Sequence, residues 1–179
     1  MVNTKRIRLF ENDVTITGKH YTYIKFLVSD AQLFDDYIDV YLCGAVVGYL
    51  YNTKSDKDNS LRATGKIYAD AFSNHREDCM FLYRLITLLD NEELDNEERV
   101  NRAFRYDGDN TKEEVVKECV ENFNAYVRGG IECMYKDFTT GCTNRDDYIV
   151  NSIKIAKKFK DELSDDMSYE ERLKQEMMK

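Results

Sequence analysis

Two short stretches of this sequence carry residue types that could do metal or acid–base chemistry. The first, YDGDNTKEEVVKE at residues 106–118, puts oxygen-bearing side chains at positions 1, 3, 5 and 12 of a calcium-binding EF-hand loop, namely Asp107, Asp109, Thr111 and Glu118. Such a loop needs glycine at its sixth position for a sharp turn, and this chain has Lys112 there. Thr111 and Glu114 also fit the S/T-x-x-E pattern that begins a helix. A helix start is therefore expected here, and no metal site.

The second stretch is the tetrapeptide HRED at residues 75–78, with Asp70 five residues before His75. Acid–base catalysis would need these groups to converge, whereas consecutive residues of a helix point to different faces. A solvated helical face accounts for them, and an enzyme site around His75 is the least favoured function. Because Walker A, G-x-S-x-G, H-E-x-x-H and G-x-G-x-x-G sequences do not occur, we assign no catalytic, cofactor-binding or metal-binding residue and expect no cofactor.

The adjacent glycines Gly129 and Gly130 are a third candidate, because paired glycines can cradle a phosphate. Helical pattern continues on both sides of them, whereas a phosphate cradle lies between a strand and the start of a helix. Two glycines inside a helix cost about 2 kcal/mol relative to alanine. Close approach of another helix is the usual compensation.

Gly44 and Gly48, four residues apart, share one face of an earlier predicted helix. We therefore predict that the two glycine pairs pack against each other, either within this chain or against a partner. The candidates for this helix-packing or interface role are Gly44, Gly48, Tyr126, Arg128, Gly129 and Gly130.

These side chains must be positioned by helices, because hydrophobic spacing is mostly helical along the chain. The pattern predicts helices over 30–52, 65–90, a short stretch opened by Asp95 and Glu98, 111–138, 146–163 and 168–179. Residues 5–28 favour β-branched and aromatic types and alternate at Val14, Ile16, Tyr21 and Tyr23, which favours short strands. We expect a mostly α, single-domain bundle of about five to six helices. Residues 1–29 form a basic arm or short strands, 30–163 the helical domain and 164–179 a C-terminal helix with frayed ends.

The five cysteines are odd in number, widely spaced and without a C-x-x-C pair, which excludes a disulfide framework or a zinc site and favours a reducing cytoplasm. Cys43, Cys79 and Cys119 fall among apolar helical neighbours, where cysteine is usually buried. The longest apolar run, residues 45–51, is too short to span a bilayer, and the first ten residues lack an apolar signal region. We expect a cytoplasmic protein with no membrane contact.

Charge is unevenly distributed along the chain. The net charge of -8 argues against a general nucleic-acid binder, since phosphate contacts need a basic surface. Residues 1–29, however, carry five basic and two acidic groups, while residues 30–138 carry 13 basic and 23 acidic ones. A local DNA contact by Lys5, Arg6 and Arg8 is therefore the second function considered.

Two segments resemble a known family. LFDDYIDVYLCGAVVGYLYN at 33–52 is similar to the early helix of small accessory proteins encoded beside bacterial DNA phosphorothioation and related phage-defence genes. ENFNAYVRGGIECMYKDF at 121–138 is similar to a later helix with a YxxGG centre in the same proteins. The resemblance implies a small non-catalytic component that works with larger ATPase or nuclease subunits, and it brings no catalytic residue with it.

The favoured function is consequently an adaptor or regulatory subunit of a multi-component antiphage or DNA-modification complex. Its partner would be a larger ATPase or nuclease subunit, with DNA reached mainly through that partner. Tyrosine and arginine dominate protein-binding hot spots, and this chain has 13 tyrosines. The alternative explanation for the tyrosines is that they fill the core.

Overall fold

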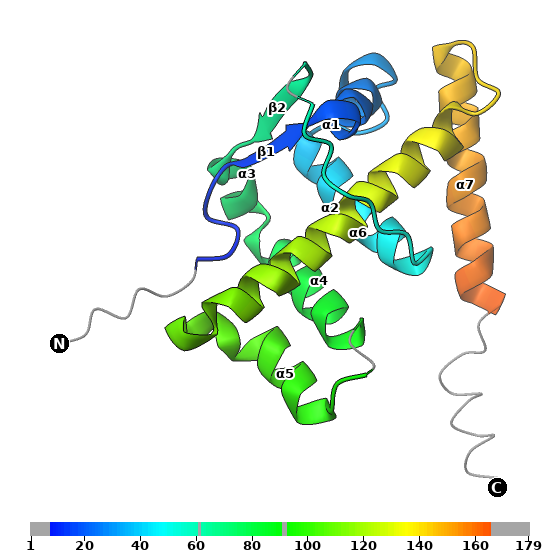
Figure 1. The fold of residues 1–179 in the computed structure, drawn as a ribbon. Coiled ribbons are helices and arrows are strands. Elements are labelled where there is room, and N and C mark those ends of the chain that lie inside the picture. Colours follow the sequence, from blue (N-terminus) through cyan, green and yellow to red (C-terminus); the bar gives the residue numbers. More distant parts are fainter. Residues whose placement is uncertain (1–7, 61, 91–92, 166–179) are drawn as a thin grey trace, which may run out of the picture. The chain divides into compact units, whose positions relative to one another are not determined.

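The computed structural model describes residues 8–60, 62–90 and 93–165. Within these ranges the chain forms seven α-helices and one two-stranded sheet (Figure 1). The helices are α1 Gly18–Lys25, α2 Tyr37–Leu50, α3 Ala69–Asn74, α4 Arg76–Leu89, α5 Asn96–Phe104, α6 Glu113–Thr139 and α7 Arg145–Asp165. Strands β1 Val14–Thr17 and β2 Thr64–Ile67 pair in antiparallel fashion, with Val14 opposite Ile67 and Thr17 opposite Thr64. The predicted mostly α fold with a short N-terminal β element is confirmed.

The chain divides into two compact units, Met1–Tyr135 and Lys136–Lys179. In the second unit, the Asp147 carboxylate accepts a hydrogen bond from the Thr143 backbone N–H at 2.8 Å, just before α7 begins. The Asn151 side-chain amide donates to the Asp137 carbonyl at 2.6 Å and so ties α7 to the end of α6. No α7 side chain in residues 145–161 is buried.

The core of the first unit is an aromatic cluster contributed by four helices and the N-terminal segment. Phe72 of α3, Tyr83 of α4 and Phe123 of α6 are almost fully buried. The ring of Phe10 lies 5.9 Å from those of Phe72 and Phe123 and 6.1 Å from that of Tyr83, and Tyr41 of α2 lies 5.4 Å from Phe72. Aromatic pairs at these separations and in tilted or edge-on arrangements stabilise a core beyond the area they bury. Part of the tyrosine content is therefore core material.

The segment expected to be strand-like is only partly so, because α1 begins directly after β1. Gly18 takes the left-handed conformation, with φ of 61°, and turns the chain from strand into helix. Asp58, distant in sequence, accepts a hydrogen bond from the Lys19 backbone N–H at 2.8 Å. A carboxylate at a helix N-terminus satisfies free amides there and suits the helix dipole. Tyr21 and Tyr23, predicted as extended, are therefore helical.

The helix predicted from residue 30 begins later, at Tyr37. Phe26–Asp30 forms a π-helical turn, and Gln32 has a left-handed φ of 51° that interrupts helical geometry. The Asp36 backbone N–H donates to the Asp39 carboxylate at 3.0 Å, which fixes the new helix start. Cys43 of α2, expected to be buried, is exposed.

The single helix predicted over 65–90 is in fact a strand and two helices, β2, α3 and α4. The break between α3 and α4 lies at His75, whose φ of -110° and ψ of 25° fall outside helical values. The start of α6 is also displaced, to Glu113, because a short 3-10 helix, Asn110–Lys112, precedes it. Asp109 caps that 3-10 helix by accepting from the Thr111 backbone N–H at 2.9 Å. Asp95 does cap α5, as predicted, by accepting from Glu98 N–H at 2.8 Å. The predicted helix over 168–179 lies outside the described residues.

Candidate functional site

The structure brings the two glycine pairs together inside one chain, at the crossing of α2 and α6. A Cβ atom added to Gly130 would meet the Gly44 carbonyl oxygen and would lie 2.7 Å from the backbone nitrogen of Gly48. A Cβ on Gly48 would likewise meet the Tyr126 carbonyl oxygen. These are contacts between backbones, which cannot move aside as a side chain can. At Gly48 and Gly130, the crossing therefore has room for a hydrogen atom but not for a side chain.

Gly129 faces a different neighbour, the segment that follows α2. We call residues 52–58 the strap; it runs across α6 on its way to β2 (Figure 1). A Cβ on Gly129 would meet the Thr53 carbonyl oxygen and lie 3.1 Å from the backbone nitrogen of Lys54. The Ser55 backbone N–H also donates to the Ala125 carbonyl of α6 at 3.0 Å. The expectation that α2 packs on both glycines is thus corrected, because Gly129 accepts the strap.

Tyr126 and Arg128 hold the same region from the α6 side. Tyr126 is 1% exposed, and its hydroxyl donates to the carboxylate of Asp90 at the end of α4. Arg128 donates from Nε to the Ser55 carbonyl of the strap at 2.8 Å and from its terminal nitrogen to Glu121 at 2.6 Å. Both side chains are used within the chain, so a partner would not reach the glycine crossing without opening it.

The structure describes only some of the remaining predicted residues. Lys5 and Arg6 lie outside the described residues. Arg8 is 74% exposed and pairs with Glu11 at 3.5 Å. His75 lies 3.8 Å from Asp78, and both side chains are open to solvent. Within the described residues, no group of three or more histidine, cysteine, aspartate or glutamate side chains could hold a metal ion.

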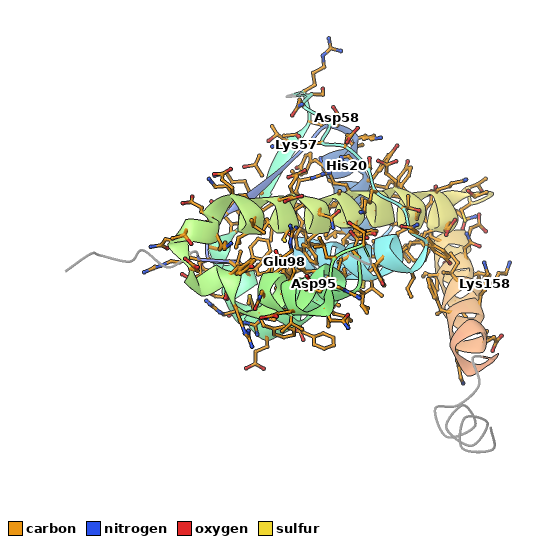
Figure 2. The ribbon with its side chains drawn as sticks, turned by 60° about the horizontal axis from the view of Figure 1, so that its bottom comes forward. His20, Lys57, Asp58, Asp95, Glu98 and Lys158 are labelled. Atoms are coloured by element: carbon orange, nitrogen blue, oxygen red, sulfur yellow. The ribbon has the colours of Figure 1, made fainter. Side chains whose placement is uncertain are left out.

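One polar cluster around the buried His20 was not foreseen, and it joins α1, the strap and α6. His20 is 1% exposed, and its Nε2 lies 2.9 Å from Oε1 of Glu132, while the Ser55 hydroxyl donates to the same oxygen. Lys19 pairs with that oxygen at 2.9 Å. Figure 2 shows His20, Lys57 and Asp58 on one side of α6 and Asp95 and Glu98 on the other.

The shared acceptor of this cluster is one carboxylate oxygen of Glu132, to which Ser55 and His20 both point. The Ser55 hydroxyl also lies 3.4 Å from Nε2 of His20. Burial lowers the pKa of His20, although Glu132 favours its charged form. Burial alone would raise the pKa of Glu132, yet hydrogen bonds from Ser55, Lys19 and His20 bring it below its usual value. The carboxylate therefore stays charged and ties three segments together.

An open groove of about 1010 Å³ lies along α4 in the first unit. We call it the α4 groove. Its lining comes from the segment before β1, from α4, from the end of α5 and from the turn after it: Arg8, Leu9, Glu11, Arg76, Glu77, Met80, Phe81, Arg84, Leu85, Leu88, Phe104 and Asp107. Phe81 is 64%, Phe104 47% and Leu85 37% exposed. Large apolar side chains gathered in one exposed hollow mark a binding surface more often than scattered ones do.

Arg84 is the polar centre of this groove. Its guanidinium carbon lies 5.4 Å from the centre of the Phe104 ring, and its terminal nitrogen lies 3.8 Å from the Asp107 carboxylate. Its Nε is buried without a hydrogen-bond partner in the part of the chain that the structure describes. A buried donor without a partner is costly. Sequence reasoning missed the groove because Phe81 and Leu85 also fit the spacing of a core face.

Comparison with known proteins gives no relative: no family model, no curated protein and no solved structure matches this chain. In the described ranges, no helix combines the length and the apolar character needed to cross a membrane.

Proposed function

We propose that this protein is a non-catalytic adaptor that docks on a larger protein subunit through the α4 groove. The observation that carries the proposal is the combination of exposed Phe81, Leu85 and Phe104 with Arg84 in one hollow. Aromatic and arginine side chains dominate the centres of protein interfaces, where both bury apolar area and arginine adds several donors.

The kind of assembly rests on the resemblance of residues 33–52 and 121–138 to accessory proteins of DNA phosphorothioation and related phage-defence systems. It supports a role beside a larger ATPase or nuclease subunit in such a complex. DNA would be reached mainly through that partner, because the chain carries a net charge of -8 and Arg8 already pairs with Glu11. A cytoplasmic setting agrees with five cysteines that are all free.

The test is affinity capture of the full tagged chain, co-expressed with the products of its neighbouring genes. Wild type should retain one large subunit in a defined ratio, identified by mass spectrometry. Phe81→Ser should lose that subunit. Tyr68→Ser is the matched control, because Tyr68 is also 64% exposed but lies outside the α4 groove, and it should retain the subunit.

Two results would contradict the proposal. One is the absence of any stoichiometric partner among the neighbouring gene products. The other is a partner that Phe81→Ser and Tyr68→Ser retain equally well, since the α4 groove would then have no part in docking. Circular dichroism of each variant shows whether a loss of binding comes from unfolding.

A further inference from the structure

The α4 groove has the length and spacing that suit a helix. Phe81, Leu85 and Leu88 line it at spacings of four and three residues, so they form one row along α4. Seven residues of helix cover about 10 Å, which is two turns of a partner helix. Helices that bind in grooves present apolar anchors at the same i, i+4 and i+7 positions. Phe104 of α5 adds an apolar wall beside this row.

The charges of the groove favour an acidic occupant. Its lining holds three arginines and three acids, but the arginines are the more exposed set. The side chains of Arg8 and Arg76 are 74% and 46% exposed, whereas that of Glu11, which pairs with both, is 29% exposed.

Within the span of the apolar row, the side chain of Arg84 is 34% exposed and that of Asp107 14%. Glu77 is an exposed acid at the rim and weakens this asymmetry without reversing it. The incoming ligand thus meets Arg8 and Arg76 before the apolar row and Arg84 beside it.

The rest of the molecule strengthens this preference. The net charge of -8 means that an acidic segment is repelled from most of the surface and attracted where arginines protrude. We infer that the α4 groove binds an amphipathic helix of the partner protein whose apolar stripe is flanked by aspartate or glutamate. The inference rests on the proposed function and names the chemistry of the segment that docks. A carboxylate of that helix would pair with the part of the Arg84 guanidinium that is exposed in the groove.

The experiment measures binding of the full chain to two synthetic 18-residue helical peptides by fluorescence anisotropy. Both peptides carry the same Leu/Phe stripe, with glutamate flanks in one and lysine flanks in the other. The acidic peptide should bind at least about tenfold more tightly, and its advantage should shrink as salt is raised. Phe81→Ser should weaken it by about tenfold or more, while Tyr68→Ser leaves it unchanged.

Two arginine variants test how much charge contributes to binding of the acidic peptide. Arg8→Gln removes an exposed arginine of the groove and should weaken the acidic peptide by about twofold to fivefold. Arg62→Gln removes an exposed arginine that does not line the groove and should have no effect. Arg8→Gln should not weaken binding of the lysine-flanked peptide.

Several outcomes would overturn the inference. They are tighter binding of the lysine-flanked peptide, binding of the acidic peptide that survives Phe81→Ser, and displacement of the peptide by duplex DNA in a manner lost with Arg8→Gln. Sedimentation gives a further such outcome. If the chain self-associates and Phe81→Ser converts it to a monomer, a second copy of the chain is the occupant of the groove and the inference is overturned.

Failure here is distinguishable from failure of the adaptor function. If Phe81→Ser abolishes capture of the large subunit but neither peptide binds, the groove docks a partner of other chemistry. If the acidic peptide binds in the groove but capture is insensitive to Phe81→Ser, the helix preference stands and the adaptor proposal falls.

Discussion

Gly130 offers the sharpest test of how α2 and α6 pack. Gly130→Ala places a methyl group against the Gly44 carbonyl and the Gly48 nitrogen, both of which are backbone atoms. We expect a loss of about 3 kcal/mol or more in the free energy of unfolding, despite the helix-propensity gain of about 1 kcal/mol. Urea denaturation measures the loss, and Gly130→Leu should unfold the first unit altogether.

Gly108→Ala is the control for that measurement. A Cβ at Gly108 would have no heavy atom within 4 Å, so its stability should stay within about 0.5 kcal/mol of wild type. A Gly130→Ala protein as stable as Gly108→Ala would show that the helices lie farther apart than described.

The lowered pKa values of His20 and Glu132 predict that the folded protein loses stability in acid. The folded pKa of His20 is lowered by burial, so its contribution is complete above pH of about 6.5 and is lost as the pH falls through the folded pKa. The folded pKa of Glu132 is also lowered, so its contribution is lost only at pH below about 4.5. Both groups therefore lower the free energy of unfolding as the pH falls, His20 below pH of about 6.5 and Glu132 below pH of about 4.5.

Urea denaturation between pH 7 and 4 checks the upper window, where the slope should reach up to about 1.4 kcal/mol per pH unit. His20→Gln should flatten that slope below pH of about 6.5 even though the variant is less stable overall. His75→Gln is the control, because His75 is open to solvent, and it should keep the wild-type slope. A slope unchanged by His20→Gln would contradict the assignment.

Substitution of Gly129 instead of Gly130 tests the packing of the strap on α6 separately from that of α2. Gly129→Ala directs a methyl group at the Thr53 carbonyl and leaves the Gly44 and Gly48 contacts alone. We expect the strap to detach while the helices stay packed, with a loss smaller than that for Gly130→Ala. Limited proteolysis should then show cleavage within 52–58 that rises by about tenfold or more, since a local opening of 1.4 kcal/mol is a tenfold change in population. Equal cleavage of the two variants would show that strap and α2 detach together.

The sequence predicts elements well where one periodic pattern is long and its ends carry caps. α6 was foreseen because its apolar residues keep helical spacing over many turns, and the spacing of Gly44 and Gly48 indicated their shared face. The break at His75 was missed because neither glycine nor proline marks it. Ser55, His20 and Glu132 were missed because the last two are 112 residues apart in sequence and only the fold brings them together.

The two units should differ in local stability. The first has an aromatic core, whereas α7 has no buried side chain in residues 145–161 and exposes Ile149, Val150 and Ile153. Native-state hydrogen exchange should therefore be at least about a hundredfold slower in the α6 segment around Phe123 and Val127 than in α7. Equal protection of both helices would mean that α7 is buried by a contact outside its own unit.

The α2–α6 crossing also restricts how the sequence can change during evolution. Because Gly48 and Gly130 each meet backbone, replacement at either one cannot be rescued by trimming a neighbouring side chain. Descendants of the same ancestor can exchange most surface residues, yet they should retain glycine at these two positions and the spacing between them. A search of genomes for a G-x-x-x-G helix followed some 80 residues later by G-G within a second helix should find relatives that overall identity does not reveal.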